Sequence, residues 1–240
     1  MEKRSGVTFF PAKPYKFTHR TDDFGWAKNH EGKWYYTAFV EAGRVFDADN
    51  VSFKQAFLEI AQARKADFRF SCNQNIIVSD VEQQHKDWVN DILTKYNVIK
   101  VTENASLIRK DSIACVALNT CPLALAEGQR YLPSLLDKID TIIDKYQLNN
   151  EHISIRMTGC PNGCARPYTA EIGFVGTSLG HYNMMLGADN RGERLNKLYK
   201  ESLDEKAILI ELDNLLDAYS SQKKASETFG DFTLRKGIVH

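Results

Sequence analysis

Four of the five cysteines in this chain fall into two closely spaced pairs. Cys115 and Cys121 are separated by five residues, and Cys160 and Cys164 by three. Four thiolates on two short loops are the ligand set of an iron–sulfur cube, because each sulfur binds one iron corner while backbone amides hydrogen-bond the sulfides. The cysteines therefore make a [4Fe-4S] cluster the first candidate for the chemistry of this chain.

The second pair lies in a segment with its own local signals. Pro161 follows Cys160, and proline is favoured in the first turn of a helix. We expect a helix to begin there and to turn its unpaired N–H groups toward an anionic cluster. Gly163 would let the backbone come close to a bulky group.

Two other uses of the cysteines stay open. Structural zinc also takes four cysteines, usually with two to four residues between the members of a pair, and only the second pair fits that spacing. Two disulfides would require an oxidising compartment. The chain begins Met-Glu-Lys-Arg-Ser-Gly with no apolar run that would suggest a signal peptide, so a reducing cytoplasm is expected.

The elements that precede the first pair alternate between strand and helix patterns. Pro11 and Pro14 favour an extended arm up to about residue 20. A hairpin is expected over residues 25–40, a helix from Ser52, strands at 68–72 and 76–78, and a helix through 89–96. The polar stretch at 102–104 is the predicted domain boundary.

The elements around the two pairs place both of them near strands. A helical stripe is expected after Pro133, and residues 153–157 alternate as a strand that ends at the second pair. Strands at 171–175 and 182–186 and a helix through 208–219 follow. A site at the end of a strand is held rigidly.

The cysteine segments are similar to a known family. Residues 114–124 and 157–166 resemble the two cluster segments of sulfite reductase hemoproteins, in the siroheme-dependent sulfite and nitrite reductase family. Thr120-Cys121-Pro122 resembles the sulfite rather than the nitrite reductases. Related strings extend over almost the whole chain: residues 14–18, 25–26, 39–44, 73–77 and 229–232.

The resemblance implies a fold and a division of the chain. It implies an α+β protein with a ferredoxin-like half-domain over residues 1–102, the second of two family repeats with an N-terminal arm. A [4Fe-4S]/siroheme-binding α/β domain would follow over residues 103–240. The chain resembles the C-terminal half of these proteins, and their first half, which supplies most of the basic residues that hold sulfite and siroheme, is expected to be encoded separately or lost by truncation.

The resemblance also implies roles for particular residues. Cys115, Cys121 and Cys160 would be plain cluster ligands, and Cys164 would join the cluster to the siroheme iron. The expected siroheme contacts are Asn73, Gln74, Asn75 and Asn162. The implied reaction is the six-electron reduction of sulfite to sulfide, with electrons from a flavoprotein subunit that uses NADPH, or from ferredoxin.

Several of these residues also have plainer interpretations. The Asn-Gln-Asn string at 73–75 could be simple turn chemistry, and Arg156 and Arg166 could be solvated charges or could balance an anionic cofactor. Cys72 is expected to be a small buried residue in a strand. Asp22 and the carboxylates around Glu201 to Glu205 are expected to be solvated.

Composition limits the classes of partner. The 240 residues hold 31 basic and 31 acidic side chains, and this zero net charge argues against nucleic acid. No apolar run approaches the length needed to span a membrane. The competing functions are a cluster-bearing electron-transfer or scaffold module without activity of its own, a zinc-stabilised domain, and a siroheme nitrite reductase.

Overall fold

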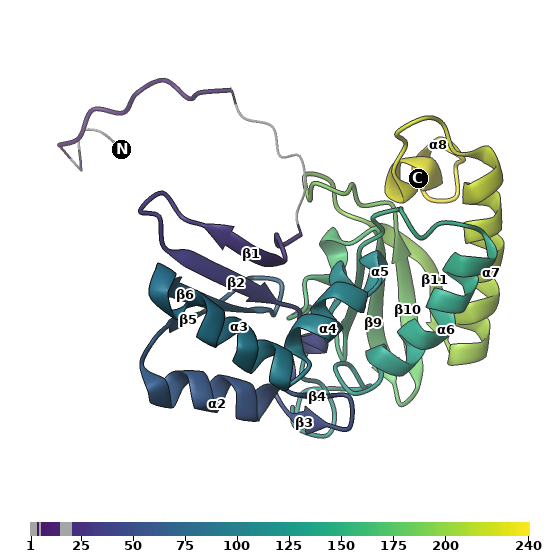
Figure 1. Cartoon of the computed structure of the whole chain (residues 1–240). Coiled ribbons are helices and arrows are strands. Elements are labelled where there is room, and N and C mark those ends of the chain that lie inside the picture. Colours follow the sequence, from purple (N-terminus) through teal and green to yellow (C-terminus); the bar gives the residue numbers. More distant parts are fainter. Residues whose placement is uncertain (1–3, 5, 15–20) are drawn as a thin grey trace.

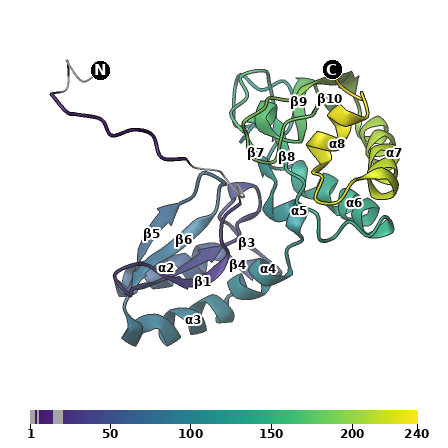
Figure 2. The ribbon, with the colours of Figure 1, turned by 90° about the horizontal axis from the view of Figure 1, so that it is seen from above.

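The chain forms two α+β domains that lie side by side, with the amino-terminal segment reaching away from both (Figure 1; Figure 2). The computed structural model describes residues 4, 6–14 and 21–240. Residues 6–14 contain neither helix nor strand, as expected for an arm. The end of the predicted arm, residues 15–20, lies outside the described residues.

The first domain is built on a four-stranded antiparallel sheet in the order β1-β2-β6-β5. Its core is formed by the sheet and the two long helices that cover it, with Tyr36, Val78, Ile60 and Leu93 among the buried side chains. The elements are β1 (Gly25–Lys28), β2 (Trp34–Ala38), β5 (Asp67–Phe70), β6 (Ile76–Val81), α2 (Phe53–Ala63), α3 (Lys86–Lys95), α4 (Val98–Asn104), and the short pair β3 (Asp47–Ala48) and β4 (Val51–Ser52).

The expected hairpin and helices of this domain are confirmed. β1 and β2 pair from Gly25 opposite Thr37 to Lys28 opposite Trp34. Helix α2 follows Ser52, but the Ser52 side chain makes no capping hydrogen bond. Instead the Asp47 carboxylate accepts the N–H groups of Lys54 and Gln55, at 2.9 and 3.3 Å. A carboxylate at a helix start satisfies these otherwise unpaired donors.

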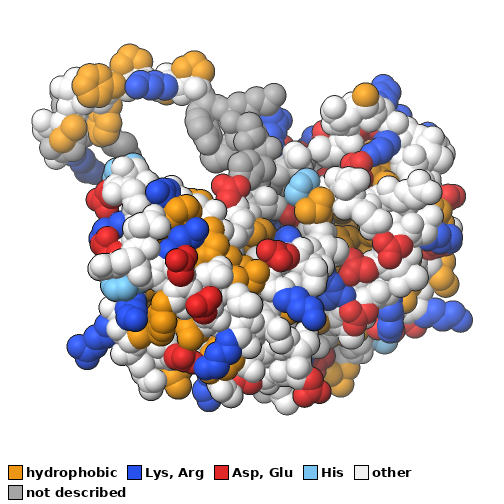
Figure 3. Space-filling view, in the orientation of Figure 1, with side chains coloured by type: hydrophobic (Ala, Val, Ile, Leu, Met, Phe, Trp, Pro, Cys, Tyr) orange, Lys and Arg blue, Asp and Glu red, His pale blue; other side chains and the backbone are white. Residues whose placement is uncertain are grey.

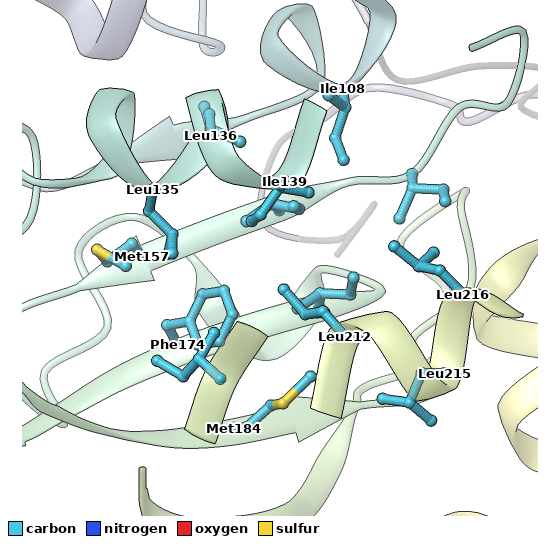
Figure 4. Packing of buried hydrophobic residues seen from close by; sticks show 14 of the residues in the cluster. Ile108, Leu135, Leu136, Ile139, Met157, Phe174, Met184, Leu212, Leu215 and Leu216 are labelled. Carbon is cyan, nitrogen blue, oxygen red and sulfur yellow. The ribbon is translucent and has the colours of Figure 1, made fainter. Parts of the chain in front are cut away.

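The second domain is built on a mixed five-stranded sheet in the order β11-β10-β9-β8-β7. β7, β8 and β9 are parallel, and β9, β10 and β11 are antiparallel. Apolar side chains of α6 and α7 pack together over the sheet, with Leu135, Ile139 and Leu212 facing Met157 and Phe174 (Figure 4). The elements are α5 (Leu107–Lys110), β7 (Ile113–Ala114), α6 (Leu132–Lys145), β8 (Ile155–Thr158), β9 (Ile172–Ser178), β10 (His181–Leu186), β11 (Lys197–Leu203), α7 (Glu205–Gln222) and α8 (Phe229–Arg235).

The turn at residues 41–43 and an arginine cluster are among the contacts between the two domains. The 3₁₀ turn Glu41–Gly43 belongs to the first domain in sequence, yet Ala42 is buried in the core of the second. The Arg109 guanidinium pairs with Glu41 and also with Asp137 and Asp140 of α6. The predicted boundary after residue 102 falls inside α4. Because Ala42 lies far before that boundary and is buried in the second core, residues of the first domain in sequence help to form the second.

The face of the molecule shown in Figure 3 carries both signs of charge without large segregation. Lysine and arginine alternate there with aspartate and glutamate over both domains. This pattern agrees with the zero formal charge. No helix in the described part of the chain is long and apolar enough to cross a membrane.

Candidate functional site

The two cysteine pairs follow neighbouring parallel strands. β7 and β8 pair Ile113 with Arg156 and Ala114 with Met157. The Cys115 N–H continues this ladder with a 3.0 Å bond to the Met157 carbonyl. Because parallel strands end at the same edge of a sheet, the loops that carry the cysteines leave it side by side.

The two loops are hydrogen-bonded into one unit. The Gly159 carbonyl accepts the N–H groups of Leu125 and Ala126, at 2.8 and 3.0 Å. A Cβ at Gly159 would lie 2.7 Å from the Ala126 carbonyl oxygen and 2.8 Å from the Ala117 Cβ. Glycine is therefore required at this position for the loops to meet.

The Cys115 sulfur already receives two donors. The Gly159 N–H lies 3.2 Å from Sγ, and the Thr158 hydroxyl lies 3.4 Å from it. Hydrogen-bond donors directed at a ligand sulfur are a standard means of tuning a thiolate-bound metal.

The far end of the Cys115 loop is hydrogen-bonded to a side chain of β10. The Tyr182 hydroxyl donates to the Glu127 carbonyl at 3.1 Å, and its ring stacks on Tyr131. Burial, with the nearby Glu127 carboxylate, raises the pKa of Tyr182 well above its usual range. Tyr182 therefore stays protonated and keeps this hydrogen bond at physiological pH.

The number and chemical type of the cysteine donors are those of a [4Fe-4S] cluster, and their ligation of one remains a prediction. All five cysteines lie in the described part of the chain, and none forms a disulfide. Cys160 is buried, Cys115 and Cys121 are half-buried, and Cys164 is exposed. Among the residues that the structure describes, no three His, Cys, Asp or Glu side chains are grouped closely enough to hold a single metal ion. A cube requires wider spacing than a single ion, because each thiolate binds a different iron.

The helix expected from Pro161 is absent, and this prediction was wrong. Residues 161–166 form successive turns, closed by the bonds Gly163 N–H to Cys160 carbonyl and Arg166 N–H to Gly163 carbonyl. Gly163 and Arg166 both have positive φ, at 69° and 56°. A left-handed residue ends a right-handed helix, so proline at its favoured position was not enough.

The string Asn73-Gln74-Asn75 lies in a corner between β5 and β6 that we call the polar corner (residues 71–75). The Asp22 carboxylate accepts hydrogen bonds from the side chains of Ser71, Asn73 and Asn75. The buried Asn75 amide oxygen also accepts the Val40 N–H at 3.0 Å. Asp22 was expected to be solvated; it is instead the carboxylate that organises the corner.

The polar corner touches both cysteine loops. The Gln74 side chain bonds to the backbone of Ala114, the residue before Cys115, with Nε2 donating to the carbonyl at 2.7 Å and Oε1 accepting the N–H at 3.1 Å. The Arg166 guanidinium donates to the Cys72 carbonyl at 2.7 Å, from a position two residues past Cys164.

Other single residues differ from expectation. Cys72 is exposed rather than buried, because β5 ends at Phe70 and the cysteine lies in the corner. Arg156 is buried, and its guanidinium donates to the Arg166 carbonyl and to the Thr169 hydroxyl. Asn162 lies between the cysteines and is exposed. Its contact with siroheme, like those of Asn73, Gln74 and Asn75, remains a prediction.

Comparison with known proteins identifies the class of this fold. The model of the "Nitrite/Sulfite reductase ferredoxin-like half domain" matches residues 27–96, within the first domain. The structure of the Mycobacterium tuberculosis NirA protein superposes with a TM-score of 0.76 at 20% identity, over 95% of this chain and 42% of that one. The chain thus has the α+β fold of this class and contains its ferredoxin-like half domain.

Curated relatives define the particular protein it resembles. A sulfite reductase [NADPH] hemoprotein beta-component from Leptospira biflexa is 58% identical over all of this chain and 43% of its own length. Those from Bacillus licheniformis and Salmonella arizonae are 46% and 44% identical, again over all of this chain but 42% and 41% of theirs. The chain is a partial homologue of the sulfite reductase hemoprotein beta-components and spans under half of their length.

Proposed function

We propose that this chain supplies the cluster- and siroheme-binding part of an assimilatory sulfite reductase hemoprotein. The observation that carries the proposal is the union of the two cysteine loops at the ends of β7 and β8, in a chain homologous throughout to hemoprotein beta-components. Cys115, Cys121, Cys160 and Cys164 would hold a [4Fe-4S] cluster, and Cys164, the exposed member, would also reach the siroheme iron.

The chain's own residues would orient these groups. When bound, the cluster and siroheme would supply a one-electron relay and an iron that binds the sulfur of sulfite. The parallel strands hold the loops, and the Gly159 N–H and the Thr158 hydroxyl hold the Cys115 sulfur. The electron donor would be an NADPH-dependent flavoprotein subunit or ferredoxin, and the site of action the cytoplasm; the names of the relatives favour the former donor.

The arginines near the two cysteine loops bear on how siroheme would be held. Siroheme carries many carboxylates that need cationic partners. Arg166 and Arg156 bind backbone carbonyls and a hydroxyl, and Arg130 donates to the Leu118 carbonyl and the Thr120 hydroxyl. These three arginines are engaged within the chain, and we expect the siroheme carboxylates to need further basic partners, from this chain and from the rest of the hemoprotein.

We expect the 240-residue chain alone to show no sulfite reduction with a reduced dye. Reconstitution with siroheme and with the remaining part of the Leptospira biflexa relative should restore a strong Soret band, and turnover with it. The spectrum separates the proposal from a cluster-bearing module without activity, which gives only one broad shoulder. Robust turnover by the chain alone would overturn the need for the rest of the hemoprotein, and preference for nitrite would favour the nitrite reductase alternative.

The assembled complex also tests the role of Cys164. In Cys164→Ser the link that Cys164 would make to the siroheme iron should be lost, because these irons select thiolates over hydroxyls. We expect a shifted Soret band and loss of magnetic coupling between the two centres in Mössbauer or EPR spectra. Cys121→Ser should disturb chiefly the cluster. Coupling that survives Cys164→Ser and disappears in Cys160→Ser would assign the bridge to Cys160.

A further inference from the structure

We propose that Gln74 is a positioning residue that fixes Cys115 from the first domain by completing the open edge of β7. The inference rests on the proposed function only where it concerns the cluster. Its structural part concerns Ala114 and can be measured in the protein without metal.

The Gln74 side chain lies where a further strand would pair with β7. β7 is the last strand of its sheet, and the Cys115 N–H is directed toward β8. In a strand the backbone groups of successive residues point in opposite directions, so those of Ala114 face away from β8. The primary amide of Gln74 meets both of them, with one donor and one acceptor bond. A neighbouring strand would offer this same pair of groups.

Gln74 is itself held in place for this contact. Its φ is +69°, in the left-handed region that side chains rarely occupy. The polar corner imposes this conformation through Asp22 and through the Gln74 N–H bond to the Ser71 carbonyl. Gly43 leaves room on the other side, since a Cβ there would lie 3.1 Å from the Gln74 Cβ. Strain that the surroundings enforce is typical of functional positions.

The same corner reaches the second loop. The Cys72 carbonyl accepts the Arg166 guanidinium, while Gln74 bonds to Ala114. Two residues of one turn in the first domain therefore hold the backbone beside Cys115 and the side chain beside Cys164. The relative position of the two cysteine loops thus depends on a rigid turn that belongs to neither loop.

Hydrogen exchange of the metal-free chain tests the contact directly. In Gln74→Met, which keeps the volume but loses the amide, the Ala114 N–H should exchange about tenfold faster, as expected for one lost net hydrogen bond. Amides of β9 and β10 should be unchanged. Gln55→Met, at an exposed position of α2, is the matched control and should leave Ala114 protected. Unchanged protection of Ala114 in Gln74→Met would overturn the proposal.

A second variant separates hydrogen bonding from filling of space. In Gln74→Glu the carboxylate opposes the Ala114 carbonyl, whereas the protonated acid can donate to it and accept the N–H. The folded state therefore favours the proton, and the protection is greatest at low pH. It falls as pH rises through the raised pKa of the new carboxyl, because the carboxylate keeps only the acceptor bond to the Ala114 N–H and repels the carbonyl. Protection factors, corrected for intrinsic exchange, should be near wild type at pH 5 and lower at pH 8. Equal values at both would contradict the role.

The link to the cluster is tested on reconstituted protein. We expect Gln74→Met to lose iron to a chelator several-fold faster than wild type and Gln55→Met, and its reduced cluster to give an altered EPR spectrum. If the wild type takes up no iron, the proposed function fails while the exchange measurements still decide the contact with Ala114. If iron loss and EPR match wild type although Ala114 exchanges faster, Gln74 holds the strand edge but does not position Cys115 for the cluster.

Discussion

Replacement of Cys115 by serine is expected to abolish cluster assembly. After anaerobic reconstitution we expect about four iron and four sulfide per wild-type chain, following the four-cysteine ligation of a cube. Serine is a poor ligand for such iron, so the variant should retain little of either. The Cys115 sulfur also receives the Gly159 N–H and the Thr158 hydroxyl, which link it to the strand carrying the second pair. Iron and acid-labile sulfide assays give the result.

The chain supplies a matched control for this experiment. Cys72→Ser makes the same chemical change in the polar corner, at an exposed thiol outside the two pairs. Its iron content should remain that of the wild type. Because metal binding is linked to folding, the melting temperature of reconstituted Cys115→Ser should also fall while that of Cys72→Ser does not. Full iron content in Cys115→Ser would remove this residue from the ligand set, and zinc without iron in the wild type would favour the structural-zinc alternative.

Replacement of Gly230 by alanine is expected to cost more stability than the other variants proposed above. A Cβ at Gly230 would lie 1.7 Å from the Ala188 carbonyl oxygen and 2.9 Å from its carbon. The Gly230 N–H also donates to the buried Glu171 carboxylate at 3.0 Å, so α8 cannot move away without leaving that carboxylate short of a donor. We expect a loss of about 4 kcal/mol or more, measured by urea unfolding.

Gly32→Ala provides the comparison for Gly230→Ala. Gly32 lies in the exposed turn between β1 and β2, where a Cβ meets no atom within 4 Å. Its φ of +81° leaves only backbone strain, of about 1–2 kcal/mol. Losses of similar size in the two variants would show that the backbone around Ala188 can yield, and that the tight contact is not a constraint on the fold.

Periodicity predicted the elements whose apolar faces are buried. α3 and α6 were recognisable because their core positions recur at helical spacing, and β10 because buried residues alternate with others. β6 was recognisable from its β-branched residues Ile76 to Val78. β11 (Lys197–Leu203) was missed because it is an edge strand. Most of its residues are exposed, and it pairs with β10 alone. Helix α8, with seven residues, is too short to show a repeat. Local pattern therefore finds an element only when a sustained face of it is buried.

The cysteine positions could be predicted, but their supports could not. Spacing alone indicated the two pairs, and the strand before Cys160 was expected and found in β8. The bond of Gln74 to Ala114 joins residues 40 positions apart, and that of Arg166 to Cys72 joins residues 94 apart. Asp22 gave no local signal because its partners are some fifty residues away. Contacts set by tertiary packing leave no periodic trace in the sequence.

The burial of Ala42 in the second core has a consequence for the order of synthesis. The turn Glu41–Gly43 contacts β7 and α6, and α6 is complete only about a hundred residues later. At about 5–20 residues per second, a ribosome needs roughly 5–20 seconds to cover that interval. All the strands and helices around the first core are made before α6 is complete. The turn Glu41–Gly43 therefore stays without its α6 contacts on the nascent chain until then. The second domain therefore completes its core only after the elements of the first domain have been made.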